Sequence, residues 1–90
     1  MSYFVETLSK TGEWVRCRRH ISGVFTGSDL DIDSDLHSGR PTEFFDLAEA
    51  KTFLDWIWKQ RLEGIEGVRV VAPVIGIVRW KAVHSTGRSR

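Results

Sequence analysis

The sequence predicts an α+β domain in which a small antiparallel sheet of four to five strands carries a single helix on one face. Segments with alternating apolar and polar residues lie on both sides of one segment with helical periodicity, and the whole chain has only 90 residues. A chain of this length supports one hydrophobic core. We therefore expect a single domain over residues 1–83 in the order β-β-(loop)-β-α-β-β, followed by a flexible basic tail over residues 84–90.

The first two strands are expected to form a β-hairpin. Residues 3–8 and 14–21 are rich in aromatic and β-branched residues, and the polar segment between them contains Gly12, which can adopt a positive φ angle. Side chains alternate between the two faces of a strand, so Cys17 is expected to be buried on one face. The opposite face then carries Trp14, Arg16, Arg18 and His20.

A helix is expected over residues 47–63, after a polar loop over residues 28–41 and a short strand over residues 42–45. Asp46 and Glu49 have the spacing of a capping box, and Gly64 has the character of a C-cap. One apolar stripe follows from the helical period, and it contains Leu47, Ala50, Phe53, Leu54, Ile57 and Trp58. Trp56 points about 130° away from the centre of this stripe.

Two further strands are expected over residues 68–72 and 74–83, interrupted at Pro73, whose nitrogen cannot donate a hydrogen bond. Apolar residues occupy both alternating positions there, with Val74, Val78 and Trp80 on one and Val71, Ile75 and Ile77 on the other. One helix covers only one face of a sheet. We therefore expect a loop, a second copy of the chain or a different protein to cover the other face.

Composition excludes several classes of protein. The chain has 13 Lys and Arg residues against 12 Asp and Glu, so its net charge of +1 gives no overall bias toward nucleic acid or membranes. The longest apolar run, residues 70–78, is shorter than the roughly 20 residues of a membrane span. Without a signal-peptide pattern, and with a single cysteine, the chain is expected to be cytoplasmic.

No pattern of catalytic residues is present, so we expect a protein that is not an enzyme and has no cofactor. The chain lacks a nucleophile elbow, a phosphate-binding glycine loop and a dinucleotide fingerprint. Cys17 and His20 are three residues apart, which on a strand places them on opposite faces, so they are not expected to share a metal or a reaction.

An acidic segment contains the most unusual local composition, with Asp29, Asp31, Asp33 and Asp35 at alternate positions. A calcium-binding EF-hand loop starting at Asp29 would need glycine and glutamate where the chain has Ser34 and Arg40, so no metal site is expected. Two interpretations stay open. The segment is either a solvated loop, or an acidic surface that docks a basic partner or the arginines of this chain.

The leading functional hypothesis is a noncatalytic protein-interaction module that forms a homodimer or binds, and inhibits, a larger partner complex. Its size and architecture are similar to those of small proteins carried by phages and other mobile elements, some of which inhibit host complexes. Unpaired apolar positions, tryptophans outside the core and the acidic segment are the candidate contacts. The partner-binding residues are predicted to be Trp14, Trp56, Val71, Ile75, Ile77, Asp29, Asp31, Asp33 and Asp35.

The alternative is binding of single-stranded nucleic acid by a basic and aromatic sheet face. Cations neutralise phosphates and aromatic rings stack on bases, so the candidate residues are Trp14, Arg16, Arg18, Arg79 and Lys81. Ion pairs with Glu6 and Glu13 across the hairpin, or with the acidic segment, would instead give these arginines a purely structural role.

Overall fold

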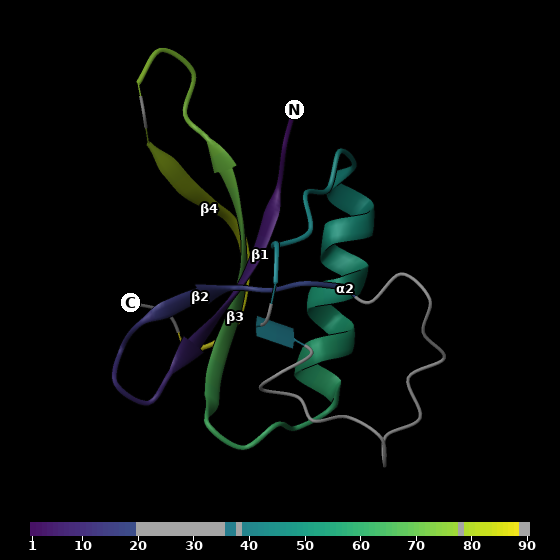
Figure 1. The fold of residues 1–90 in the computed structure, drawn as a ribbon, viewed down its shortest axis with the longest axis vertical. Helices are drawn as coiled ribbons and strands as arrows, with labels where there is room; N and C mark the ends of the chain where they lie inside the picture. Colours follow the sequence, from purple (N-terminus) through teal and green to yellow (C-terminus); the bar gives the residue numbers. More distant parts are fainter. Residues whose placement is uncertain (20–35, 38, 78, 89–90) are drawn as a thin grey trace.

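The predicted fold class is confirmed: a four-stranded antiparallel sheet carries one helix (Figure 1). A computed structural model describes residues 1–19, 36–37, 39–77 and 79–88. Within these residues the strands are β1 (Phe4–Ser9), β2 (Trp14–Arg16), β3 (Ile65–Pro73) and β4 (Trp80–Gly87), and the helix is α2 (Leu47–Lys59). The sheet has the order β2-β1-β3-β4, which places β1 and β3 in its centre.

The hydrophobic core lies between α2 and one face of the two central strands. The stripe of α2 buries Ala50, Phe53, Leu54 and Ile57. The strands contribute Val5 from β1 and Val68 and Val70 from β3, all completely buried. Full burial of a large apolar side chain contributes about 1.5–3 kcal/mol, so this layer supplies most of the stabilisation of the fold.

The helix begins where the sequence predicts and ends earlier. The carboxylate of Asp46 accepts a hydrogen bond from the Ala48 amide at 3.0 Å, which satisfies one of the free amides of the first turn. The predicted end at residue 63 is wrong, because the helix stops at Lys59. Arg61 adopts a left-handed conformation with φ of 54°, which ends the helix before Gly64 is reached.

The region around β2 differs from the prediction in strand length. The strand expected over residues 14–21 ends at Arg16, and residues 20 and 21 lie outside the described part. Past Arg16 the backbone pairs with other segments: Arg18 donates to the Leu36 carbonyl, and Thr42 donates to the Cys17 carbonyl. The strand expected over residues 42–45 is only an isolated bridge between Tyr3 and Phe44.

The last two strands differ from the prediction: β3 is longer than expected, and β4 begins and ends later in the sequence. β3 spans Ile65–Pro73, and the hairpin that joins it to β4 is closed by a 2.8 Å hydrogen bond from the Val74 amide to the Arg79 carbonyl. The expected strand over residues 74–83 is therefore wrong in its first half. β4 continues to Gly87, so the predicted domain boundary at residue 83 falls inside a strand that pairs with β3.

Candidate functional site

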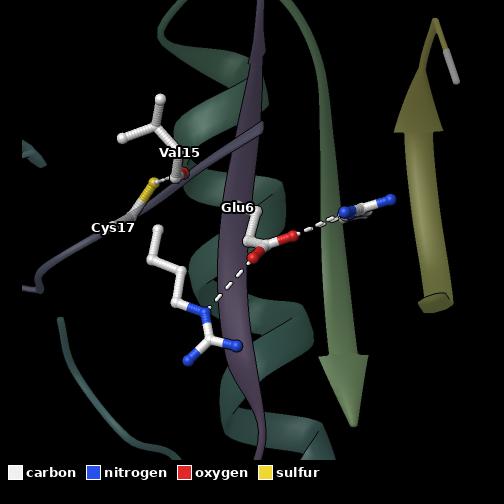
Figure 2. Close-up of polar contacts among 5 residues, drawn as sticks. Glu6, Val15 and Cys17 are labelled. Atoms are coloured by element: carbon white, nitrogen blue, oxygen red, sulfur yellow. Dashed lines mark hydrogen bonds and ion pairs between the residues drawn. The ribbon is translucent and has the colours of Figure 1, made fainter. Parts of the chain in front are cut away.

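The face of the sheet opposite α2 carries an ion-paired layer centred on Glu6. Residues directly opposite in antiparallel strands share a face, and Glu6 in β1 is opposite Arg16 in β2 and Arg69 in β3. Arg16 Nε donates to Glu6 Oε2 at 3.2 Å, and Arg69 Nη2 lies 2.8 Å from Oε1 (Figure 2). The Glu6 residue is only 8% exposed, so two cations compensate one largely desolvated carboxylate.

Aromatic rings flank both arginines of this layer. The guanidinium carbon of Arg16 lies 4.2 Å from the ring centroid of Phe4 and 4.5 Å from that of Trp80, within the range of cation–π attraction. The guanidinium of Arg69 lies 4.0 Å from the ring centroid of Trp14. We call these residues the arginine layer, and its members are Phe4, Glu6, Trp14, Arg16, Arg69 and Trp80.

The arginine layer corrects the expectation that a loop or another molecule is needed to cover this face. Leu8 and Val71 lie on the same face, since they are opposite Trp14 and Phe4, and both are buried. Long arginine side chains cover apolar surface with their aliphatic stems while their charged ends meet the carboxylate. Val71 is therefore enclosed within the chain and does not reach the surface that a partner would contact.

The residues predicted to bind nucleic acid are not gathered on one surface. Trp14 and Arg16 belong to the arginine layer, and Arg18 is partly buried against Gly39. The expectation that Lys81 joins the face of Arg16 is wrong. Lys81 is opposite Ala72, the neighbour of Val71, and so points to the other face. The sequence reasoning also missed Arg69, although its position between Val68 and Val70 places it out of phase with the core.

The hairpin formed by β3 and β4 exposes apolar side chains that nothing in the described residues covers. Ile75 is 87% exposed and Ile77 is 54% exposed, and the loop that holds them extends beyond the rest of the sheet (Figure 1). Trp80 and Val83 are partly exposed in the adjoining strand. We call this region the hairpin surface, and its members are Ile75, Ile77, Arg79, Trp80, Lys81 and Val83.

The hairpin surface is cationic. Arg79 and Lys81 are exposed. Residues 67–90 contain five Lys and Arg residues and no Asp or Glu. The net charge of the chain is close to zero, but residues 67–90 carry only positive charges. Such a segment attracts acidic groups at low ionic strength.

The remaining predicted partner residues have different positions. Trp56 is partly buried, and its ring stacks on that of Phe53 with centroids 6.1 Å apart, so it extends the core. Asp29, Asp31, Asp33 and Asp35 lie outside the described residues, and the interpretation of the acidic segment stays a prediction. Among the described residues, no group of three His, Cys, Asp or Glu side chains could hold a metal ion.

A cavity of about 220 Å³ lies at the C-terminal end of α2. Apolar side chains form most of its wall, and Arg61 is the charged residue among them; the lining residues are Ile57, Trp58, Arg61, Leu62 and Ile65. A single guanidinium without a base or nucleophile beside it provides no catalytic constellation.

Cys17 is buried beside the hairpin, as predicted. Its Sγ lies 3.7 Å from the Val15 carbonyl oxygen, to which it donates (Figure 2). Burial raises the pKa of the Cys17 thiol to about 12, because the thiolate would lose its hydration. At neutral pH the group is a small apolar side chain with almost no thiolate character.

Cys17 is expected to resist thiol reagents in the folded protein. At pH 8 a thiol with a pKa of about 12 is ionised in roughly one molecule in ten thousand, so labelling should proceed only through unfolding. Because the unfolded chain releases this proton near pH 9 and the folded chain near pH 12, stability should fall as pH rises between these values. Reaction with a chromogenic disulfide and urea unfolding from pH 7 to 10 test this, with Cys17→Ala as the control for the pH slope. Rapid labelling of the folded protein at pH 8 would contradict it.

The described part of the chain contains no helix long and apolar enough to cross a membrane. No family model, curated protein or solved structure matches the chain.

Proposed function

We propose that the chain is a noncatalytic, cytoplasmic protein-interaction module whose partner docks on the hairpin surface. The exposure of Ile75 and Ile77 carries this proposal. Each isoleucine would contribute about 1.5–3 kcal/mol if a partner buried it fully, which is the size of a hot-spot contribution. Trp80 and Val83 add apolar area next to them.

The arginine layer supports this location by elimination. It covers the face opposite α2 with side chains of the chain itself, so the sheet faces offer no large apolar area around Leu8 and Val71. The hairpin loop receives no such cover from the described residues. Exposed isoleucines beside a cationic strand are typical of a contact surface with an apolar centre and a charged rim.

A different protein fits the hairpin surface better than a second copy of the chain. Arg79 and Lys81 carry the same sign, so two hairpin surfaces brought together would repel each other, and like charges at an interface disfavour association. We therefore propose a different protein as the partner, in preference to the homodimer that the sequence also predicted. Light scattering at micromolar concentration distinguishes the two, because the preferred version gives a monomer in the absence of the partner.

Binding of single-stranded nucleic acid is the runner-up function. The acid-free segment over residues 67–90 favours it. The engagement of Arg16 and Trp14 in the arginine layer disfavours it, because a guanidinium already paired with Glu6 gains less from a phosphate. Absence of binding to a single-stranded oligonucleotide at low ionic strength would eliminate this function.

The test of the interaction proposal compares two affinity-tagged variants with the wild type in extracts of the source cells. Ile75→Asp combined with Ile77→Asp places charge at the tip of the hairpin, and Phe45→Ser removes an equally exposed apolar residue elsewhere. We expect a specific protein to copurify with the wild type and with Phe45→Ser, and to be lost from the double variant. Circular dichroism verifies that all three chains are folded. Identical sets of copurifying proteins would contradict the proposal.

A further inference from the structure

β4 is the long open edge of the sheet. It lies at the end of the strand order, it has eight residues, and no described residue pairs with its outer side. At about 3.4 Å per residue this edge is roughly 27 Å long. The amides and carbonyls that point away from β3 are unpaired along it, and the register with β3 shifts at Val83, between Ala82 and His84. The opposite edge strand, β2, has three residues, and the backbone that follows it is bonded to Leu36 and Thr42.

The charge on β4 limits what can pair with this edge. Lysine on an edge strand prevents uncontrolled pairing with other sheets, because pairing with a neutral or basic strand would leave the lysine cation without an opposite charge. Lys81 is exposed on β4, and Arg79 immediately precedes the strand. The same cations favour one kind of incoming strand, which is an acidic one.

The side chains of β4 define a pattern for such a strand. Trp80 lies on the face of the arginine layer, next to Phe4, with ring centroids 5.4 Å apart. Lys81 lies on the other face, opposite Ala72. Neighbouring residues of an added strand also alternate between these faces, so acidic residues would meet Lys81 while apolar residues would extend the surface of Trp80.

We propose that β4 accepts an acidic extended segment of a partner protein as a fifth strand, with acidic and apolar residues in alternation. This inference rests on the proposed interaction function and adds both the mode of binding and the chemistry of the partner. Main-chain hydrogen bonds along the edge provide affinity, and the alternating side chains provide selectivity.

The test uses a synthetic nine-residue peptide of alternating glutamate and valine, with two control peptides in which lysine or glutamine replaces glutamate. Titration calorimetry should detect binding of the acidic peptide, at least tenfold weaker binding of the glutamine peptide, and none of the lysine peptide. Lys81→Glu should weaken the acidic peptide at least tenfold. Lys10→Glu, the same charge reversal in the turn between β1 and β2, should leave binding within twofold.

Amide hydrogen exchange identifies the mode of binding. A saturating concentration of the acidic peptide should slow exchange at the outward-facing amides of β4 at least tenfold and leave α2 unchanged. Binding without this protection would overturn strand addition, while the interaction function at Ile75 and Ile77 would stand. The opposite combination is also informative. If the peptide protects β4 but the variant with Ile75→Asp and Ile77→Asp still copurifies the partner, strand addition stands and the role of the hairpin tip is refuted.

Three further outcomes would overturn the inference. The first is absence of binding by the acidic peptide. The second is a dimer in which the β4 amides are protected without any peptide, because the occupant would then be a second copy of the chain. The third is a single-stranded oligonucleotide that binds more tightly than the peptide and depends equally on Lys81, because the partner would then be a nucleic acid.

Discussion

Replacing Phe44 with alanine is expected to lower the free energy of unfolding by about 3–5 kcal/mol. The ring is 1% exposed, and its centroid lies 5.6 Å from that of Phe53 in α2. The guanidinium of Arg19 covers it at 4.9 Å, and its backbone exchanges two hydrogen bonds with Tyr3. Truncation would leave a cavity beneath a segment that has no regular strand of its own to hold it in place.

The neighbouring residue provides a matched control for this prediction. Phe45 is 71% exposed, so Phe45→Ala should change the free energy of unfolding by no more than about 0.5 kcal/mol. Small domains have total stabilities of about 5–15 kcal/mol, so Phe44→Ala should be largely unfolded at moderate urea concentrations that leave Phe45→Ala folded. Urea unfolding followed by tryptophan fluorescence measures both variants. Similar midpoints for the two variants would show that Phe44 is not a core residue.

Replacing Glu6 with glutamine is expected to cost about 2–3 kcal/mol, somewhat less than for a fully buried pair because both arginines retain contact with water. The carboxylate accepts from Arg16 with one oxygen and from Arg69 with the other. Glutamine offers one acceptor, and its NH₂ group would face the second guanidinium. Two cations would then share this face without a compensating anion, although the side chain has nearly the same shape.

Glu66→Gln is the control for Glu6→Gln. Glu66 pairs with Arg88 at 3.1 Å on the surface, where a salt bridge contributes about 0–1 kcal/mol. A chain in which Leu replaces Glu6 and Met replaces both arginines should recover most of the stability lost in Glu6→Gln, because no unpaired charge is left on the face. Urea unfolding of these variants provides the comparison. Equal losses for Glu6→Gln and Glu66→Gln would refute the structural role of the arginine layer.

The sequence predicted α2 and its N-cap well because both depend on local signals. The stripe of Phe53, Leu54 and Ile57 has the helical period, and Asp46 needs only the amides of the next turn. The end of the helix depends on where the chain must turn back toward β3. Arg61 makes that turn in a conformation that is unfavourable for a residue with a Cβ, so Gly64 was a misleading signal.

The sequence singled out two residues of the hairpin surface, Ile75 and Ile77, but predicted that they lie in a strand. Residues 74–78 are apolar, which is typical of a buried strand, whereas Ile75, Gly76 and Ile77 are exposed in a turn in which Gly76 has a φ angle of 87°. Sequence periodicity cannot distinguish these cases, since an exposed apolar loop contradicts the ordinary preference of loops for polar residues. Ile75 and Ile77 were predicted to lie outside the core, and both are exposed, whereas their role in binding a partner stays a prediction.

The arginine layer was predicted only in part because it depends on the pairing of distant strands. Trp14 and Arg16 share a face through local alternation, and Glu6 was considered as a partner for the arginines of the hairpin. The contribution of Arg69 requires β3 to lie beside β1, and strand order cannot be derived from the periodicity of either strand. A charged residue flanked by valines in a central strand indicates a partner on the same face.

The pairing of β1 with β3 also determines when the chain can fold. Phe4 is opposite Val71, so the two central strands are far apart in the sequence, with β2 and α2 between them. β3 and β4 are joined by a short loop and can pair as soon as both exist, but β1 must wait for β3 to become available. Structures dominated by such distant pairings fold more slowly than those built from local contacts. During synthesis, Val5 and Leu8 therefore stay without their neighbours in the central sheet until β3 has been made.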